Sequence, residues 1–199
     1  MIEVEIKVSL ENKDIEKIIA DLKDIGFKKS GIKEQIDVYY NGIDRDFRET
    51  DEALRIRRSA NLNEDLSVIN ENTYVTYKGK KLDKISKTRV EHETAVEDID
   101  TMDNIFKSLG FKSVEPVRKV RKLLRKVIGA TEDEYIEASI DKVDNVGQYL
   151  ELEITVESFE QKDEALGKLF SVLEEIGIDK NNLELKSYLE LRDEKLGIY

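Results

Sequence analysis

The chain opens with the stretch Ile2-Glu3-Val4-Glu5-Ile6-Lys7-Val8, in which apolar and charged residues alternate. Because successive side chains of a β-strand point to opposite faces, the three charged residues share one face of the predicted strand. The Glu-x-Glu pattern returns as Val90-Glu91-His92-Glu93 and as Leu150-Glu151-Leu152-Glu153-Ile154. Three predicted strands therefore each present two carboxylates from one face.

Composition excludes several classes of protein. The 199 residues carry a net charge of -11, and such a field repels nucleic-acid and anionic membrane surfaces, so we expect neither as a partner. The absence of Cys excludes disulfides and thiolate metal sites, and the single His disfavours a His-based zinc site or a Ser-His-Asp triad. No signal-like or membrane-spanning apolar run is visible, so we expect a cytoplasmic protein.

An amphipathic helix follows each Glu-x-Glu strand. Apolar residues at helical spacing predict helices over about 15–25, 102–109 and 166–176, each closed by a Gly. Asn12 and Asp100 are the N-caps we expect for the first two. A last helix is predicted over about 180–195.

Between these units the alternation predicts further strands, and no linker divides the chain, so we expect one domain over residues 1–199. The strands are predicted at about 33–40, 53–59, 73–80, 117–127 and 134–142, with loops near 41–52, 61–72 and 143–148.

The polar faces of these strands carry charges of both signs, whereas the opposite faces are largely apolar. About eight strands are enough to close a barrel that holds side chains or one small ligand, with amphipathic helices packed outside. A charged interior cannot be a dry core, so a closed barrel would contain a solvated, ligand-holding tunnel. The alternative is an open sheet with one wet, salt-bridged face and helices on the other. Pairs such as Arg55-x-Arg57 favour the tunnel.

An ordered set of motifs covers nearly the whole chain. They are Glu3-x-Glu5-x-Lys7, 35–40 (QIDVYY), 53–58 (ALRIRR), 76–80 (TYKGK), 87–91 (KTRVE), 119–121 (KVR), 141–143 (DKV), 147–153 (GQYLELE) and 186–188 (KSY). In this order they resemble the CYTH superfamily of triphosphate tunnel metalloenzymes, and most closely its class IV adenylyl cyclase-like branch, which is related to thiamine triphosphatase. The resemblance implies an α+β fold whose core is a closed eight-stranded antiparallel β-barrel with a charged lumen.

The resemblance also implies roles for the charged residues. Mg²⁺ or Mn²⁺ prefers oxygen ligands, and the expected metal ligands are Glu3, Glu5, Glu151 and Glu153. Arg forks and Lys ammonium groups bind phosphate oxygens, and the expected triphosphate-binding residues are Arg55, Arg57, Lys78, Lys80, Arg89, Lys119, Arg121 and Lys186, the last of them on the C-terminal helix.

Two residues are candidates for a catalytic role. Lys7 would bind phosphate or, with a lowered pKa, assist proton transfer, although neighbouring carboxylates oppose that lowering. Asp141 would orient an attacking water or a basic side chain. His92 alternates to the apolar side and is expected to pack there.

The implied substrate is a small triphosphate: ATP, inorganic triphosphate or thiamine triphosphate. In a class IV adenylyl cyclase the ribose O3′ attacks the α-phosphorus of ATP and releases pyrophosphate, which is the activity we expect. If water attacks the terminal phosphorus instead, the chain is a triphosphate hydrolase. A non-catalytic polyphosphate or nucleotide sensor and a homodimer are left open.

Overall fold

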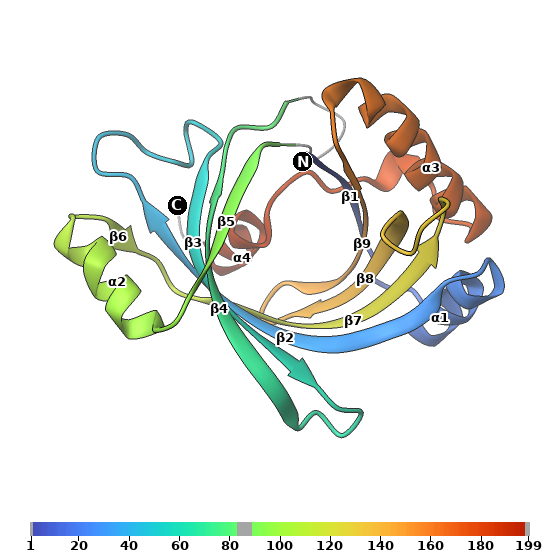
Figure 1. Ribbon diagram of the computed structural model, residues 1–199, viewed down its shortest axis with the longest axis horizontal. Coiled ribbons are helices and arrows are strands. Elements are labelled where there is room, and N and C mark those ends of the chain that lie inside the picture. The colour runs from blue at the N-terminus through green and yellow to red at the C-terminus, as the bar shows by residue number, and fades with distance from the viewer. Residues whose placement is uncertain (1, 83–88, 198–199) are drawn as a thin grey trace.

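The structure, a computed structural model, describes residues 2–82 and 89–197. In this part of the chain eight antiparallel strands form one sheet in the order β1-β9-β8-β7-β2-β3-β4-β5, and the short β6 pairs with β2. The strands are β1 Ile2–Ser9, β2 Lys28–Asn41, β3 Ala53–Leu62, β4 Val68–Lys78, β5 Glu91–Val96, β6 Lys112–Ser113, β7 Val117–Val127, β8 Tyr135–Val143 and β9 Gly147–Val156. Figure 1 shows the sheet curled around a concave face.

The described helices are α1 Ile15–Asp24, α2 Ile99–Ser108, α3 Lys162–Glu175 and α4 Tyr188–Leu196, with short 3₁₀ turns at Phe159–Gln161 and Lys180–Asn182. The predicted N-caps were wrong by two residues. Asp14 caps α1 and Asp98 caps α2, because each carboxylate accepts the backbone N–H three residues on. Asn12 instead has the positive φ of a turn residue.

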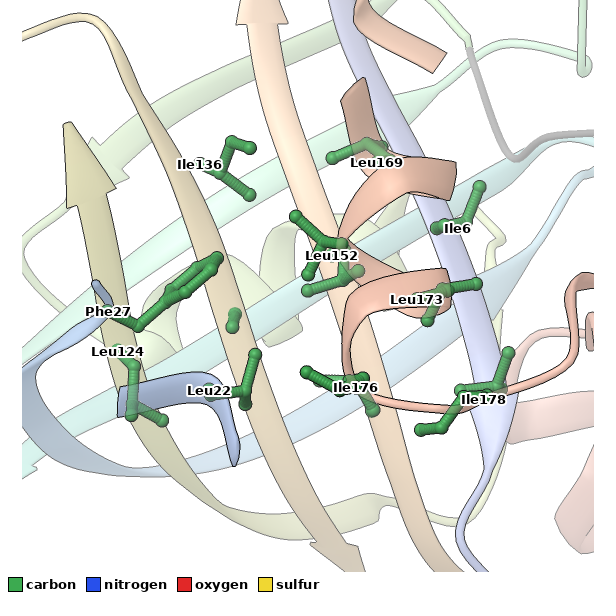
Figure 2. Close-up of a cluster of buried hydrophobic side chains, with 14 of the residues drawn as sticks. Ile6, Leu22, Phe27, Leu124, Ile136, Leu152, Leu169, Leu173, Ile176 and Ile178 are labelled. Carbon is green, nitrogen blue, oxygen red and sulfur yellow. The ribbon is translucent and has the colours of Figure 1, made fainter. Parts of the chain in front are cut away.

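The core on the convex face is formed where α1 and α3 cover β1, β9, β8 and β7 (Figures 1 and 2). Leu169 of α3, Leu22 of α1 and Leu152 of β9 are all fully buried there. Each such Leu contributes roughly 1.5–3 kcal/mol relative to an exposed side chain. Gly26 follows α1 with φ 100°, the left-handed conformation expected of a residue that ends a helix. The apolar alternation therefore predicted this face correctly.

The other half of the sheet is covered by α2. Phe106 packs edge-on against Tyr40 of β2, with ring centroids 4.9 Å apart, and Ile56 of β3 is fully buried beside them. The Tyr40 hydroxyl donates to Asp103 of α2 at 2.6 Å. This contact ties the helix to the sheet.

The predicted closed barrel is wrong: the described sheet is an open half-barrel. Its two edge strands, β1 and β5, form no ladder with each other in the described residues. The described link is an isolated bridge between Glu3 and Arg89, which lies just before β5. Alternation reports which side chains face inward, whereas closure depends on strand tilt and stagger, which alternation does not encode.

The C-terminal helix was also predicted wrongly, both in its extent and in its position. The 3₁₀ turn over 180–182 gives way to extended backbone at Leu183, and the helix begins only after Ser187. Ser187 and Glu190 form a capping box, which fixes the start of α4 at Tyr188. Whereas α1, α2 and α3 lie outside the sheet, α4 lies within the curl, where Tyr188 packs on Tyr149 (Figure 1).

One smaller prediction failed on β3 and β4. The segment 61–72 was expected to be a loop, but strand structure continues through Leu62 and resumes at Val68, so that only 63–67 form the turn. Pairing with β3 overrides the weak strand preference of the Asn-Glu-Asn run at 70–72. His92 lies on the predicted apolar side, opposite Tyr77 of the cluster under α2, and stacks on the Tyr77 ring at 6.4 Å, although it is exposed on the edge strand.

Candidate active site

A cavity of about 280 Å³ lies on the concave face of the sheet. It is lined by all four predicted metal ligands and by most of the predicted triphosphate-binding residues. These are Glu3, Glu5, Glu151 and Glu153, together with Arg55, Arg57, Lys78, Arg89, Lys119 and Arg121. Asp37 of β2 and Glu91 of β5 also line the cavity, so its charged residues come from seven strands. They meet here because side chains alternate between the two faces of each strand, and the charged ones lie on the concave face.

Arg57 is held by a carboxylate on the neighbouring strand. Asp37 of β2 lies opposite Arg57 of β3, and the guanidinium donates two hydrogen bonds to it, at 2.6 and 2.7 Å. Burial of Asp37 opposes its ionisation, but Arg57 and Arg55 outweigh that effect and hold the pKa of Asp37 well below its usual range. The carboxylate therefore stays charged and fixes the fork of Arg57 beside the cavity.

A second, similar arrangement lies on β7 and β8. Arg121 donates to Asp141 at 2.7 and 2.6 Å, and also contacts Glu151 of β9. Asp141 is fully buried and accepts a further hydrogen bond from the Tyr188 hydroxyl at 2.9 Å. Lys119 Nζ lies 3.6 Å from the same carboxylate. Burial, followed by Arg121, lowers the pKa of Lys119 to about 8.

On the opposite side of the cavity, β3, β4 and β5 supply Arg55, Lys78 and Glu91. Arg55 is 6% exposed, with Nε 3.4 Å from Thr76 Oγ1 and one terminal nitrogen 3.5 Å from Asp37. Lys78 pairs with Glu91. Burial and then Arg55 lower the pKa of Lys78. Desolvated cations crowded in this way favour a bound polyanion.

Carboxylates crowd the wall formed by β1 and β9. Glu5 and Glu153 are directly opposite in the register, and Glu3 lies two residues along β1. Burial and then Glu91 raise the pKa of Glu3 to about 7. Burial and then Glu3 and Glu5 raise the pKa of Glu153 well above its usual range. A divalent cation would relieve this repulsion, so the oxygen donors of Glu3, Glu5 and Glu153 fit Mg²⁺ or Mn²⁺ chemically.

These carboxylates do not form a complete metal cage by themselves. Within residues 2–82 and 89–197, no group of three or more Asp, Glu or His side chains is spaced as a ready-made metal site. That is compatible with Mg²⁺, which usually takes one or two protein carboxylates and completes its shell with water and substrate phosphates. Glu151 forms an ion pair with Arg121.

Lys7, Lys80 and Lys186 do not lie as the sequence suggested. Lys7 is fully buried, with Nζ 4.1 Å from the centre of the Tyr188 ring and a hydrogen bond to the Lys186 carbonyl. Lys80 is exposed beyond the end of β4. Lys186 precedes α4 instead of lying on it, and its exposed ammonium pairs with Glu194. Lys87, which belongs to one of the quoted motifs, lies outside the described residues.

The structure adds Asp37 and Tyr188 to the site, neither of which the sequence analysis assigned a role, and it places Glu91 of the predicted Glu-x-Glu strand at the cavity. A signal for Asp37 existed, because it shares a strand face with Gln35 and follows the alternation that selected Arg55 and Arg57. Tyr188 lay within a quoted motif, but its role depends on α4 entering the curl, which alternation does not reveal.

The sequence of residues 1–188 matches the family model of the CYTH domain, and the chain belongs to this family. A protein of Methanocaldococcus jannaschii named "Putative adenylate cyclase" is 50% identical over 96% of this chain and 99% of its own length. The solved PH1819 protein of Pyrococcus horikoshii is 34% identical, covers 97% of this chain and 99% of its own, and superposes with a TM-score of 0.81.

A more distant solved structure shares the fold alone. It is an adenylyl cyclase by name, from Hippeastrum, with a reported dominant triphosphatase activity. It is 16% identical, covers 97% of this chain and 95% of its own, and has a TM-score of 0.61. The helices that the structure describes include none long and apolar enough to cross a membrane.

Proposed function

We propose that this protein is a Mg²⁺- or Mn²⁺-dependent adenylyl cyclase of the class IV type, which converts ATP to cyclic AMP and pyrophosphate. One observation carries the proposal: buried and half-buried Arg and Lys side chains surround a cavity whose remaining wall is a set of crowded carboxylates. A polyphosphate needs the former, and a cation shared with its oxygens needs the latter. The 50% identical relative with a cyclase name supports the choice of reaction.

The basic side chains of the cavity bind different parts of the triphosphate from different walls. Asp37 fixes Arg57 through its Nε and one Nη2 hydrogen, which leaves the remaining Nη donors of Arg57 for the phosphate oxygens. Asp141 and Glu151 engage Nε and Nη2 of Arg121, so Arg121 offers its Nη1. Arg55, Lys78 and Lys119 add charge from the other walls of the same cavity. Together they position the triphosphate and stabilise negative charge on departing pyrophosphate.

Glu3, Glu5 and Glu153 are the residues that would hold the cation. When bound, it supplies Lewis-acid polarisation of the phosphate oxygens. The raised pKa values of Glu3 and Glu153 mean that cation binding displaces protons from these carboxyls. Binding of the metal should therefore strengthen as pH rises through 7.

A product assay tests the proposal. Purified protein is incubated with Mg²⁺ or Mn²⁺ and either ATP or inorganic triphosphate, and the products are separated by chromatography, with EDTA as the control. The proposal predicts cyclic AMP and pyrophosphate from ATP only when metal is present. Orthophosphate from either substrate would make the protein a triphosphate hydrolase, and binding without any product would indicate a sensor.

A further inference from the structure

A second cavity, of about 420 Å³, adjoins the first along the strands. The two share a ring of five wall residues: Glu3, Arg57, Glu93, Arg121 and Glu153. On β2 the walls follow the alternation, since Asp37 lines the first cavity, whereas Gln35 and Lys33 line the second. The concave face is therefore one continuous binding surface with two compartments.

The arrangement of the first compartment limits where the rest of a substrate can go. Residues 185 and 187–190, including buried Tyr188, line that compartment together with the predicted phosphate-binding residues. The shared ring contains Arg57 and Arg121 as well as the carboxylates Glu3 and Glu153. A triphosphate held by the basic residues and the cation lies next to this ring, so a group attached to it can extend into the second compartment.

The charge of the second compartment disfavours further phosphates. Four basic and five acidic side chains line it: Lys33, Arg57, Arg121 and Arg125, against Glu3, Glu93, Asp133, Glu137 and Glu153. Such a balance offers no net attraction to another polyanion. Its volume lies within the roughly 300–1,000 Å³ of small-molecule sites, so a neutral group of moderate size fits it.

The polar lining of this compartment suits a planar group that donates hydrogen bonds. Arg125 lies over the Tyr135 ring at 4.3 Å and donates to Glu137 at 2.8 Å, which forms a flat, partly aromatic wall. Gln35 is 7% exposed, and within the described part of the chain its buried Oε1 has no hydrogen-bond partner. Burying an acceptor without a partner is unfavourable, and because the Gln35 side chain lines the compartment, a donor on a bound ligand that reaches it removes that cost.

We propose that the second compartment binds the nucleoside of the substrate, and that Gln35 accepts a hydrogen bond from an amino or hydroxyl group of that nucleoside. This inference rests on the proposed function, because it assumes that a triphosphate occupies the first compartment. It makes Gln35 a specificity-determining residue, which selects a nucleoside triphosphate over inorganic triphosphate.

The test compares two ligands across the wild type and three variants. Calorimetric titrations with Mg²⁺ and either α,β-methylene-ATP or inorganic triphosphate are performed on the wild type, Gln35→Leu and the control Gln148→Leu, which changes an exposed Gln on β9. Gln35→Leu removes an unsatisfied polar group, so its melting temperature should not fall. Gln35→Met serves as a second, flexible replacement of similar size.

Gln35→Leu should weaken binding of α,β-methylene-ATP about tenfold, as expected for the loss of one buried hydrogen bond, and leave inorganic triphosphate within about twofold. Gln148→Leu should leave both unchanged. Unchanged binding of both ligands, or equal loss of both, in Gln35→Leu and Gln35→Met would overturn the inference alone. If the wild type binds neither ligand, the proposed function fails as well.

Discussion

Arg57 and Asp37 lie opposite each other on adjacent strands and share two hydrogen bonds, of 2.6 and 2.7 Å, at the edge of the cavity. The pair is buried on the carboxylate side and more open on the guanidinium side, with side-chain exposures of 4% and 12%. Asp37 therefore orients Arg57 while leaving part of the guanidinium at the cavity. Arg121 and Asp141 repeat this relationship on β7 and β8.

Arg57→Ala should weaken triphosphate binding by at least about tenfold, because it removes a pre-oriented phosphate ligand and leaves the buried Asp37 carboxylate close to the substrate. Calorimetry with inorganic triphosphate and Mg²⁺ measures the change. Arg58→Ala is the matched control, since Arg58 is adjacent on β3 but points to the other face and pairs with Glu34. Equal affinity of the two variants would remove Arg57 from the binding site.

Glu5→Gln should abolish turnover that depends on Mg²⁺ or Mn²⁺ and leave the fold intact, because the substitution keeps the shape of the side chain and removes its charge. Product formation across a range of metal concentrations measures the effect, and circular dichroism checks the fold. Glu16→Gln, on the outer helix α1, should have no effect. Normal activity of Glu5→Gln at the wild-type metal concentration would refute the metal assignment.

Metal-free protein should lose stability as pH rises from about 4.5 to about 7. Glu3 has a pKa of about 7 in the folded protein against 4.5 for the unperturbed group, so the folded state holds more protons across this interval. Melting temperatures between pH 4.5 and 8 should decline less steeply in Glu3→Gln than in the wild type, and Mg²⁺ should restore stability above pH 7. An identical decline in the variant would show that Glu3 is not the source.

Tyr188→Phe should lower the free energy of unfolding by about 1.5–3 kcal/mol, because it deletes a hydrogen bond to the buried Asp141 side chain, which also pairs with Arg121. The Phe ring can still pack on Tyr149 and cover Lys7. Urea denaturation measures the difference. A variant as stable as the wild type would mean that the contact of α4 with the concave face depends on packing alone.

Lys186→Ala should leave triphosphate affinity within about twofold, in contrast to Lys119→Ala, which should weaken it severalfold or more. Lys186 pairs with Glu194 at an exposed position, whereas Lys119 is 4% exposed at the cavity wall. Titration of both variants with inorganic triphosphate decides the matter. A large loss in Lys186→Ala would restore its predicted role.

Alternation predicted the strand residues that line the cavity. The side chains of Glu3, Glu5, Arg55 and Arg57 face inward because each follows the period of two along its strand, and the same rule places Val4 and Ile56 in the core. The order of the motifs along the chain then identified the family. Both signals are local in sequence, which is why they could be read without the structure.

The failures concern long-range geometry. The position of Lys7 depends on the segment before α4, which lies beneath its ammonium, and the bridge between Glu3 and Arg89 depends on how far the sheet curls. The orphaned acceptor of Gln35 also becomes visible only when its neighbours on β3 and β7 are in place. None of these contacts between distant segments produces a periodic pattern of residues in the sequence.

A crystal structure of the protein with α,β-methylene-ATP and Mn²⁺ tests the central claim most directly, because anomalous scattering locates the metal independently of the ligand. The account predicts the triphosphate in contact with Arg55, Arg57 and Arg121, and Mn²⁺ bound to at least one of Glu3, Glu5 and Glu153. Phosphates bound outside the concave face, or Mn²⁺ remote from those carboxylates, would contradict it.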